Sequence, residues 1–124
     1  MPTPTKTQAE HAMRLRRLRE STAARISVAT VELDTLIGDT ADVDAGQDEG
    51  GGEGDGTQLE RDRLRAAIAR EEETLESIDA AIVRAGTDQW NRCATCGAKI
   101  PIARIQAIPA ADRCVTCKAA STTW

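Results

Sequence analysis

The stretch CATCGAKIPIARIQAIPAADRCVTC, from Cys93 to Cys117, contains all four cysteines of this 124-residue chain. They form two Cys-x-x-Cys pairs separated by a spacer of seventeen residues. A two-residue gap lets both thiolates of a pair face one ion from a tight turn, and the long spacer brings the second pair to the opposite side. The pattern predicts a tetrahedral zinc site whose ligands are Cys93, Cys96, Cys114 and Cys117.

The same four cysteines are also compatible with a redox dithiol, two disulfides or an iron–sulfur cluster. A thioredoxin-type dithiol belongs to an α/β context that this chain lacks, and disulfides are uncommon in the cytosol. Four thiolates leave no coordination position for water, so we expect one structural Zn²⁺ and no hydrolytic metal. Because Trp90 and Trp124 are the only aromatic residues, the core is thin, and metal binding would supply free energy of folding.

Upstream of the cysteines, apolar or small residues recur in steps of three and four along two stretches. This periodicity predicts two helices. The first is expected to begin at the capping box Thr7–Glu10 and to end at Gly38. The second is expected to begin at the capping box Thr57–Glu60 and to end at Gly86. The predicted seam consists of Leu15, Leu18, Thr22, Ile26, Ala29, Leu33 and Leu36 in the first helix and Leu64, Ile68, Glu71, Leu75, Ile78, Ile82 and Ala85 in the second.

Each predicted helix is apolar on one narrow face, which favours antiparallel pairing as a coiled-coil hairpin. An oligomeric bundle that uses the same faces is the alternative. The predicted fold class is all-α, a long antiparallel coiled-coil hairpin with a small C-terminal C4 zinc-finger globular end. We expect a disordered N-terminus over 1–6, the hairpin over 7–86 and the zinc-finger region over 87–124. The single histidine, His11, is expected to be an ordinary seam or surface residue.

Residues 38–57 contain seven acids and no base. Their glycines and acids favour a solvated loop at the tip of the hairpin. Without these seven, 13 of the 20 acids remain against 16 bases, so the acidity is concentrated in the loop. The loop is either a solubilising connection or a partner-binding tip. The candidate tip residues are Asp39, Asp42, Asp44, Asp48, Glu49, Glu53 and Asp55.

Four arginines lie close together in the first helix, at positions 14, 16, 17 and 19. A helix that binds a nucleic-acid duplex presents an unopposed basic face. Here the facing part of the second helix carries acids, namely Glu71, Glu72, Glu73, Glu76 and Asp79. We therefore expect a solvated, charge-paired face and no direct sequence-specific binding of DNA.

The sequence also argues against other classes of protein. The first 20 residues lack the apolar run, about seven residues or longer, of a secretory signal, and no stretch approaches the roughly 20 apolar residues that span a bilayer. We expect a cytoplasmic protein without a membrane segment. With one histidine, no phosphate-binding loop and no Ser/His/Asp or Cys/His constellation, we do not expect an enzyme.

The cysteine region resembles the DksA/TraR C4-type zinc finger family, whose pattern is C-x-x-C-G-x-x-I-x-x-x-R-[LI]-x-A-x-P-x-x-x-x-C-x-x-C. Trp90 stands where the family carries an aromatic residue, three positions before the first cysteine. Asn91 stands where glycine is usual and is expected to adopt the left-handed conformation in its place. The residues that match the pattern are Cys93, Cys96, Gly97, Ile100, Arg104, Ile105, Ala107, Pro109, Cys114 and Cys117.

The resemblance implies a coiled-coil hairpin on a zinc-bearing globular end, and RNA polymerase as the partner of a monomer. Members of this family insert the hairpin into the secondary channel of the polymerase and modulate initiation, sometimes together with the alarmone ppGpp. In the best-known members a short acidic tip motif, Asp-x-x-Asp-x-Ala, is important. Asp39 and Asp42 provide its two acids here, but Asp44 occupies the position of its alanine. The alternative is a zinc-stapled adaptor that binds another large assembly, such as the ribosome, through the sides of the hairpin.

Overall fold

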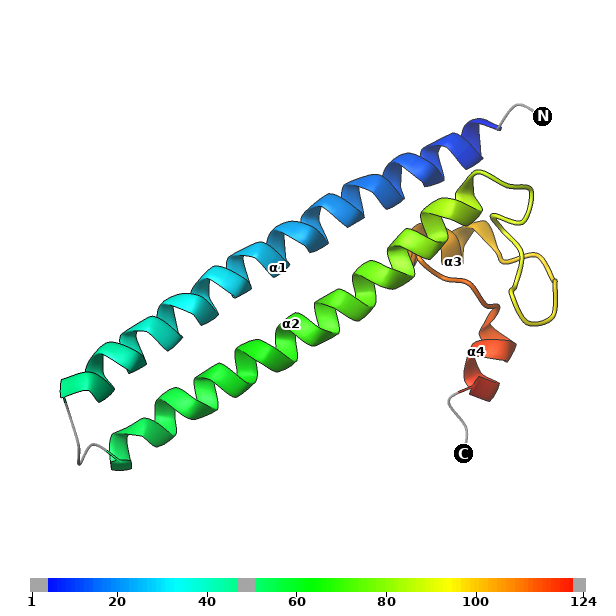
Figure 1. The fold of residues 1–124 in the computed structure, drawn as a ribbon. Helices are drawn as coiled ribbons and strands as arrows, with labels where there is room; N and C mark the ends of the chain where they lie inside the picture. The colour runs from blue at the N-terminus through cyan, green and yellow to red at the C-terminus, as the bar shows by residue number, and fades with distance from the viewer. Residues whose placement is uncertain (1–4, 47–50, 122–124) are drawn as a thin grey trace. The chain divides into compact units, whose positions relative to one another are not determined.

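The computed structural model describes the backbone of residues 5–46 and 51–121, and within them the side chains of residues 5–38 and 56–120. It contains the helices α1 (Lys6–Gly46), α2 (Gly51–Ala85), α3 (Ile102–Ala107) and α4 (Val115–Ser121) (Figure 1). The described backbone forms no strand, and its one isolated bridge joins Arg92 to Lys99. The predicted all-α class is therefore confirmed.

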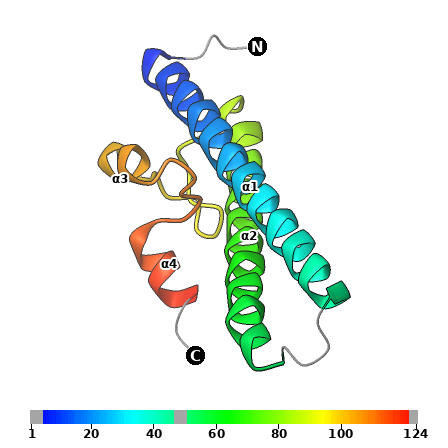
Figure 2. The ribbon, with the colours of Figure 1, turned by 90° about the vertical axis from the view of Figure 1, so that its left-hand side faces the viewer.

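The chain divides into two compact units. The first comprises residues 1–20 and 76–124 and is called here the zinc unit; the second comprises residues 21–75 and is called the helical unit. Each unit contains a part of α1 and a part of α2, and α2 lies beside α1 in both ribbon views (Figures 1 and 2). The two helices run antiparallel, because Gln8 contacts Ala85 while Arg19 contacts Asp79 within the zinc unit.

The start of α1 differs from the predicted capping box. The Oγ1 atom of Thr5 accepts a hydrogen bond from the backbone N–H of Gln8 at 3.1 Å, so Thr5 caps a helix that begins at Lys6. Thr7 is already inside the first turn. The side-chain Nε2 of Gln8 donates to the carbonyl oxygens of Ala85 at 2.8 Å and Thr87 at 3.1 Å. Gln8 therefore satisfies the last carbonyl of α2, which has no partner within that helix, and a second carbonyl two residues beyond its end.

Helical backbone also covers most of the predicted loop 38–57. Helix α1 continues through Gly38 to Gly46, and α2 begins at Gly51, so Thr57 lies inside α2 and caps nothing. One glycine costs a helix about 1 kcal/mol relative to alanine, which an already nucleated helix tolerates because each further residue adds a hydrogen bond. The predicted end of the second helix is confirmed, since α2 ends at Ala85, directly before Gly86.

The predicted seam is confirmed: all fourteen of its residues are buried or half-buried. In the zinc unit, three seam residues (Leu15, Ile78 and Ala85) form a core together with Ala81, each at most 4% exposed. Neighbouring apolar side chains complete this core, namely Ala12, Leu18, Ile82 and Ala110. Burial of this apolar surface is the main favourable contribution to helix pairing in the zinc unit.

In the helical unit, the one buried side chain among those described is polar. Thr22 is fully buried, and its Oγ1 accepts a hydrogen bond from Nη2 of Arg25 at 3.1 Å. The Nε of the same arginine donates to Glu71 of α2 at 2.9 Å. The two polar residues of the predicted seam are thus joined through one arginine, which satisfies the threonine hydroxyl and a glutamate oxygen and favours one register of the two helices.

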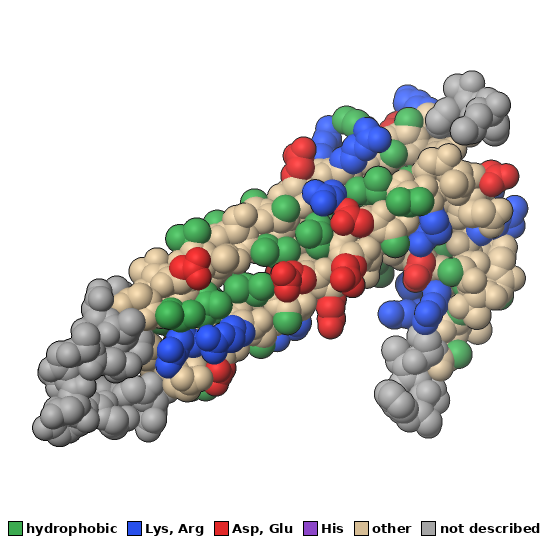
Figure 3. Space-filling view, in the orientation of Figure 1, with side chains coloured by type: hydrophobic (Ala, Val, Ile, Leu, Met, Phe, Trp, Pro, Cys, Tyr) green, Lys and Arg blue, Asp and Glu red, His purple; other side chains and the backbone are tan. Residues whose placement is uncertain are grey.

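Charged side chains gather on the outer surfaces of both helices. Lys and Arg side chains lie over the N-terminal half of α1, and Asp and Glu side chains lie on the adjacent stretch of α2 (Figure 3). Arg19 pairs with Asp79 at 2.6 Å, as the facing charges predict, but both side chains are about half exposed. Such a pair contributes at most about 1 kcal/mol. Within the described ranges, no helix is apolar over a length that would cross a membrane.

Candidate metal centre

The first cysteine pair lies in a tight turn. The backbone N–H of Cys93 donates to the carbonyl of Ala98 at 2.8 Å, and that of Gly97 donates back to the carbonyl of Cys93 at 3.0 Å. Gly97 adopts φ 76°, in the left-handed region that glycine enters without a steric penalty. The turn also lets the N–H of Cys96 point at Sγ of Cys93, 3.5 Å away. The glycine after the first pair therefore permits the tight turn that contains both cysteines.

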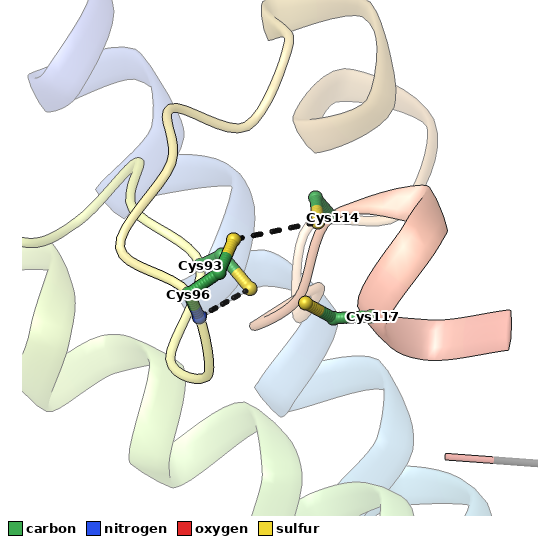
Figure 4. Close-up of side chains that lie close together, drawn as sticks. All are labelled: Cys93, Cys96, Cys114 and Cys117. Atoms are coloured by element: carbon green, nitrogen blue, oxygen red, sulfur yellow. Dashed lines mark hydrogen bonds between the residues drawn. The ribbon is translucent and has the colours of Figure 1, made fainter. Parts of the chain in front are cut away.

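The second pair lies at the start of α4. Cys114 directly precedes the helix, and its carbonyl accepts a hydrogen bond from the N–H of Lys118 at 2.9 Å. Cys117 follows within the first turn, so both thiols of this pair face the same side (Figure 4). A hydrogen bond of 2.7 Å, from the N–H of Ala94 to the carbonyl of Asp112, ties this segment to the first pair.

The four sulfurs converge, with all Sγ atoms within 4.8 Å of one another (Figure 4). Two thiolate ligands of a tetrahedral Zn²⁺ at about 2.3 Å stand about 3.8 Å apart. The Sγ atoms of Cys96 and Cys114, one from each pair, lie 3.8 Å apart. The donor set and its spacing therefore fit one zinc ion, as the cysteine spacing predicts. When bound, the ion joins the two pairs and leaves no open coordination position.

The thiols of the cluster differ in their proton affinity. Hydrogen bonds from the backbone N–H groups of Cys96 and Cys114 lower the pKa of Cys93 to about 6. Hydrogen bonding to the side chain of Cys114 raises the pKa of Cys117 to about 12. Backbone donors thus stabilise a thiolate at Cys93, while the crowded sulfurs retain a proton at Cys117. Because thiolate is the zinc-binding form, metal binding displaces protons from this cluster.

A second small core surrounds the cluster. Cys93, Ile100 and Ile105 are at most 4% exposed, and Trp90, Cys114 and Cys117 pack against them. Ile100 is fixed by a hydrogen bond of 2.7 Å from its N–H to the carbonyl of Asn91. The isoleucines at the two apolar positions of the cysteine pattern are therefore packing residues. Asn91 does not adopt the left-handed conformation expected of it, because no described residue other than glycine has a positive φ.

His11 lies in the seam, 3% exposed, with its ring centroid 5.4 Å from that of Trp90. Its Nδ1 atom is buried without a hydrogen-bond partner. Burial lowers the pKa of His11 below its usual value, and the nearby charges of Arg14 and Arg84 lower it further. A neutral imidazole packed against an indole is a structural contact, in agreement with the prediction of an ordinary seam residue.

The candidate tip residues fall at the ends of α1 and α2 and in the segment between them, and the side chains of all seven lie outside the described residues. They are Asp39, Asp42, Asp44, Asp48, Glu49, Glu53 and Asp55. Their role stays a prediction.

Sequence reasoning missed the residues that connect the cysteine region to the helices. Gln8 binds the last carbonyls of α2, and Arg84 and Arg104 donate to carbonyls just before Cys114. Arg104 belongs to the cysteine pattern, so its presence was a signal, but neither its hydrogen-bond partner nor that of Arg84 follows from spacing.

Residues 86–122 match the family described as prokaryotic dksA/traR C4-type zinc finger. Two curated relatives carry the name RNA polymerase-binding transcription factor DksA. The protein from Haemophilus influenzae is 39% identical over 49 residues, which cover 40% of this chain and 34% of the relative. The protein from Escherichia coli (strain K12) is 36% identical over 58 residues, which cover 47% of this chain and 34% of the relative. The matches span about a third of the length of these relatives.

The fold is similar to that of transcription factor DksA2 from Pseudomonas aeruginosa, with a TM-score of 0.76 and 24% sequence identity. This similarity covers 93% of the present chain and 82% of DksA2, so it includes the helices α1 and α2 as well as the cysteine region. At this identity the likeness describes the fold alone. The match to the prokaryotic dksA/traR C4-type zinc finger family thus covers residues 86–122, the part of the chain in which the four thiols converge.

Proposed function

We propose that this protein is a monomeric, non-catalytic regulator that binds RNA polymerase and modulates transcription initiation without sequence-specific binding of DNA. The observation that carries the proposal is the combination of a four-cysteine cluster that fits zinc and a pair of long antiparallel helices in one chain. The similarity to DksA2 extends over both features, and the curated relatives are named for RNA polymerase binding.

We further propose that the paired helices enter the secondary channel of the polymerase and that the acidic residues between positions 39 and 55 act there. A channel that leads to a metal-bearing catalytic centre is a place where added carboxylates change the local potential. Seven acids without a neighbouring base in this stretch support this role. The zinc-bearing end would hold the helices in place, and ppGpp is a candidate co-regulator at the complex.

The first experiment measures binding of the zinc-loaded chain to purified RNA polymerase, with a known secondary-channel protein as competitor. We expect saturable binding at or below micromolar concentrations and displacement by the competitor. Absence of binding would contradict the proposed partner, and binding without competition would contradict the proposed channel.

A second experiment separates binding from action. Asp48, Glu49, Glu53 and Asp55 are replaced by the corresponding amides, and binding and open-complex lifetime are measured with and without ppGpp. We expect binding to remain and the effect on initiation to disappear. The control replaces four exposed acids of the helical unit by amides, namely Glu32, Asp34, Glu72 and Glu73. An unchanged effect on initiation in the first variant would show that the acids at 48–55 are not the acting group. Loss of the effect in the control would show that it is not specific to those acids and would also contradict the proposal.

A further inference from the structure

Three consecutive carbonyl groups directly before Cys114 each accept a hydrogen bond from a different part of the zinc unit. The donors are a side chain of α2, a backbone N–H between the first two cysteines, and a side chain of α3. In order, they are Nη2 of Arg84 to Ala111 at 3.3 Å, N of Ala94 to Asp112 at 2.7 Å, and Nε of Arg104 to Arg113 at 3.1 Å. The direction in which the chain enters the second cysteine pair is thus set from outside α4.

Arg84 differs from the other two donors because it belongs to a helix that pairs with α1. It lies two residues before the segment that matches the zinc-finger family. Its neighbour Ala85 is part of the α1–α2 core, and Ala110, one residue before its acceptor, packs on that core. The side chain is half-buried, and its Nε atom is buried without a hydrogen-bond partner. The guanidinium is therefore enclosed between α2 and the segment that leads to Cys114.

We propose that Arg84 is a positioning residue of the zinc site. By holding the carbonyl of Ala111 against α2, it keeps Cys114 and Cys117 turned toward the first pair, so that zinc retention depends on the pairing of α1 with α2. Arginine suits this task because its planar fork donates in a fixed direction from a long apolar stem, whereas the ammonium of lysine is a point charge. Since linkage is reciprocal, bound zinc must also stabilise the pairing of the two helices.

The test measures how fast the purified, zinc-loaded full-length chain transfers its metal to an excess of a chromophoric chelator. Arg84→Met removes the donor and keeps most of the apolar stem. The net contribution of one hydrogen bond corresponds to roughly a fivefold change in an equilibrium constant or rate, and we expect release to be about fivefold faster. Arg84→Lys keeps the positive charge without the fork and should release zinc nearly as fast as Arg84→Met. A wild-type rate in Arg84→Lys would mean that charge alone matters and would overturn the proposal.

Two matched variants complete the series. Lys99→Met removes a positive charge from an exposed side chain three residues after Cys96, and we expect an unchanged release rate. Equal acceleration in this variant would also contradict the proposal. Arg104→Met removes the neighbouring side-chain donor and should accelerate release at least as much, because its bond is shorter and adjoins Cys114.

A spectroscopic readout distinguishes positioning from general stability. With Co²⁺ bound in place of Zn²⁺, the visible absorption bands report the arrangement of the four thiolates. A variant that only weakens α2 would melt at a lower temperature with unchanged bands, whereas Arg84→Met should shift them. The fall in helix melting temperature caused by a chelator should also be smaller in this variant. If Arg84→Met does not fold, Arg84→Gln serves instead. A folded variant with wild-type release rate and bands would refute the proposal.

Discussion

The zinc unit and the helical unit contain parts of the same two helices, yet they bury their side chains differently. Every buried residue among those described lies in the zinc unit except Thr22. The helical unit relies on half-buried seam residues, among them Glu71, and on the partly exposed ion pair that Glu71 forms with Arg25. Since burial of apolar surface contributes more than partly exposed ion pairs, we expect the zinc unit to be the more stable of the two.

Among the substitutions that test the difference between the two units, we expect removal of one cysteine to have the largest effect. Zinc bound to a structural site with four thiolates contributes directly to the free energy of folding. Cys114→Ser leaves only three thiolates. We expect the zinc content to fall from about one per chain to near zero, with loss of the near-ultraviolet circular dichroism of Trp90. The helical signal of α1 and α2 should fall much less. A folded zinc unit without metal would show that its two small cores suffice.

The same substitution made in each unit tests the difference in packing. Ile78→Ala in the zinc unit removes a fully buried side chain and should lower the free energy of unfolding by about 2–5 kcal/mol. Ile26→Ala in the helical unit removes a half-buried side chain and should have about half that effect. Urea unfolding of both variants measures the difference. Equal losses would mean that the two units are equally packed.

The start of α1 offers a smaller and sharper comparison. Thr5→Ala removes the hydroxyl that caps the helix and should destabilise it by about 1 kcal/mol. Thr7→Ala and Thr57→Ala alter residues inside helices, so each should change stability by no more than about 0.5 kcal/mol. Thermal unfolding followed by circular dichroism measures all three. A larger effect at Thr7 than at Thr5 would restore the capping box predicted from the sequence.

The smallest expected effect concerns pH. The pKa of His11 is lowered in the folded chain, so between that value and the usual value near 6.5 only the unfolded chain takes up the proton. Stability from this group is therefore complete above about pH 6.5 and declines as the pH falls toward the folded pKa. His11→Phe keeps the contact with Trp90 and should remove this part of the decline, as urea unfolding of zinc-saturated protein at several pH values would show. An identical pH dependence in both proteins would contradict the assignment.

The sequence predicted most of the zinc unit because its determinants are local. Cysteine spacing predicts the four thiols that the structure brings together, and helical periodicity predicts the seam. The predicted cap of the first helix was wrong because two threonines satisfy the capping-box spacing. Thr5 stands three residues before Gln8, and Thr7 stands three residues before Glu10. The predicted loop boundaries were wrong because glycine is only a weak helix breaker in an already formed helix. The hydrogen-bond acceptors of Gln8 and Arg84 are distant in the sequence, and that of Arg104 depends on the path of the backbone before Cys114. No rule of residue spacing predicts these three acceptors.

Native-state hydrogen exchange with and without a zinc chelator tests the division into two units most directly. We predict that a chelator abolishes amide protection over residues 86–121 and lowers it in the adjoining ends of α1 and α2, residues 8–18 and 76–85. Protection over residues 26–36 and 64–72 should change little, because no zinc-dependent core reaches them. Retained protection around the cysteines, or an equal loss along the whole chain, would contradict the claim that zinc organises one unit of the two.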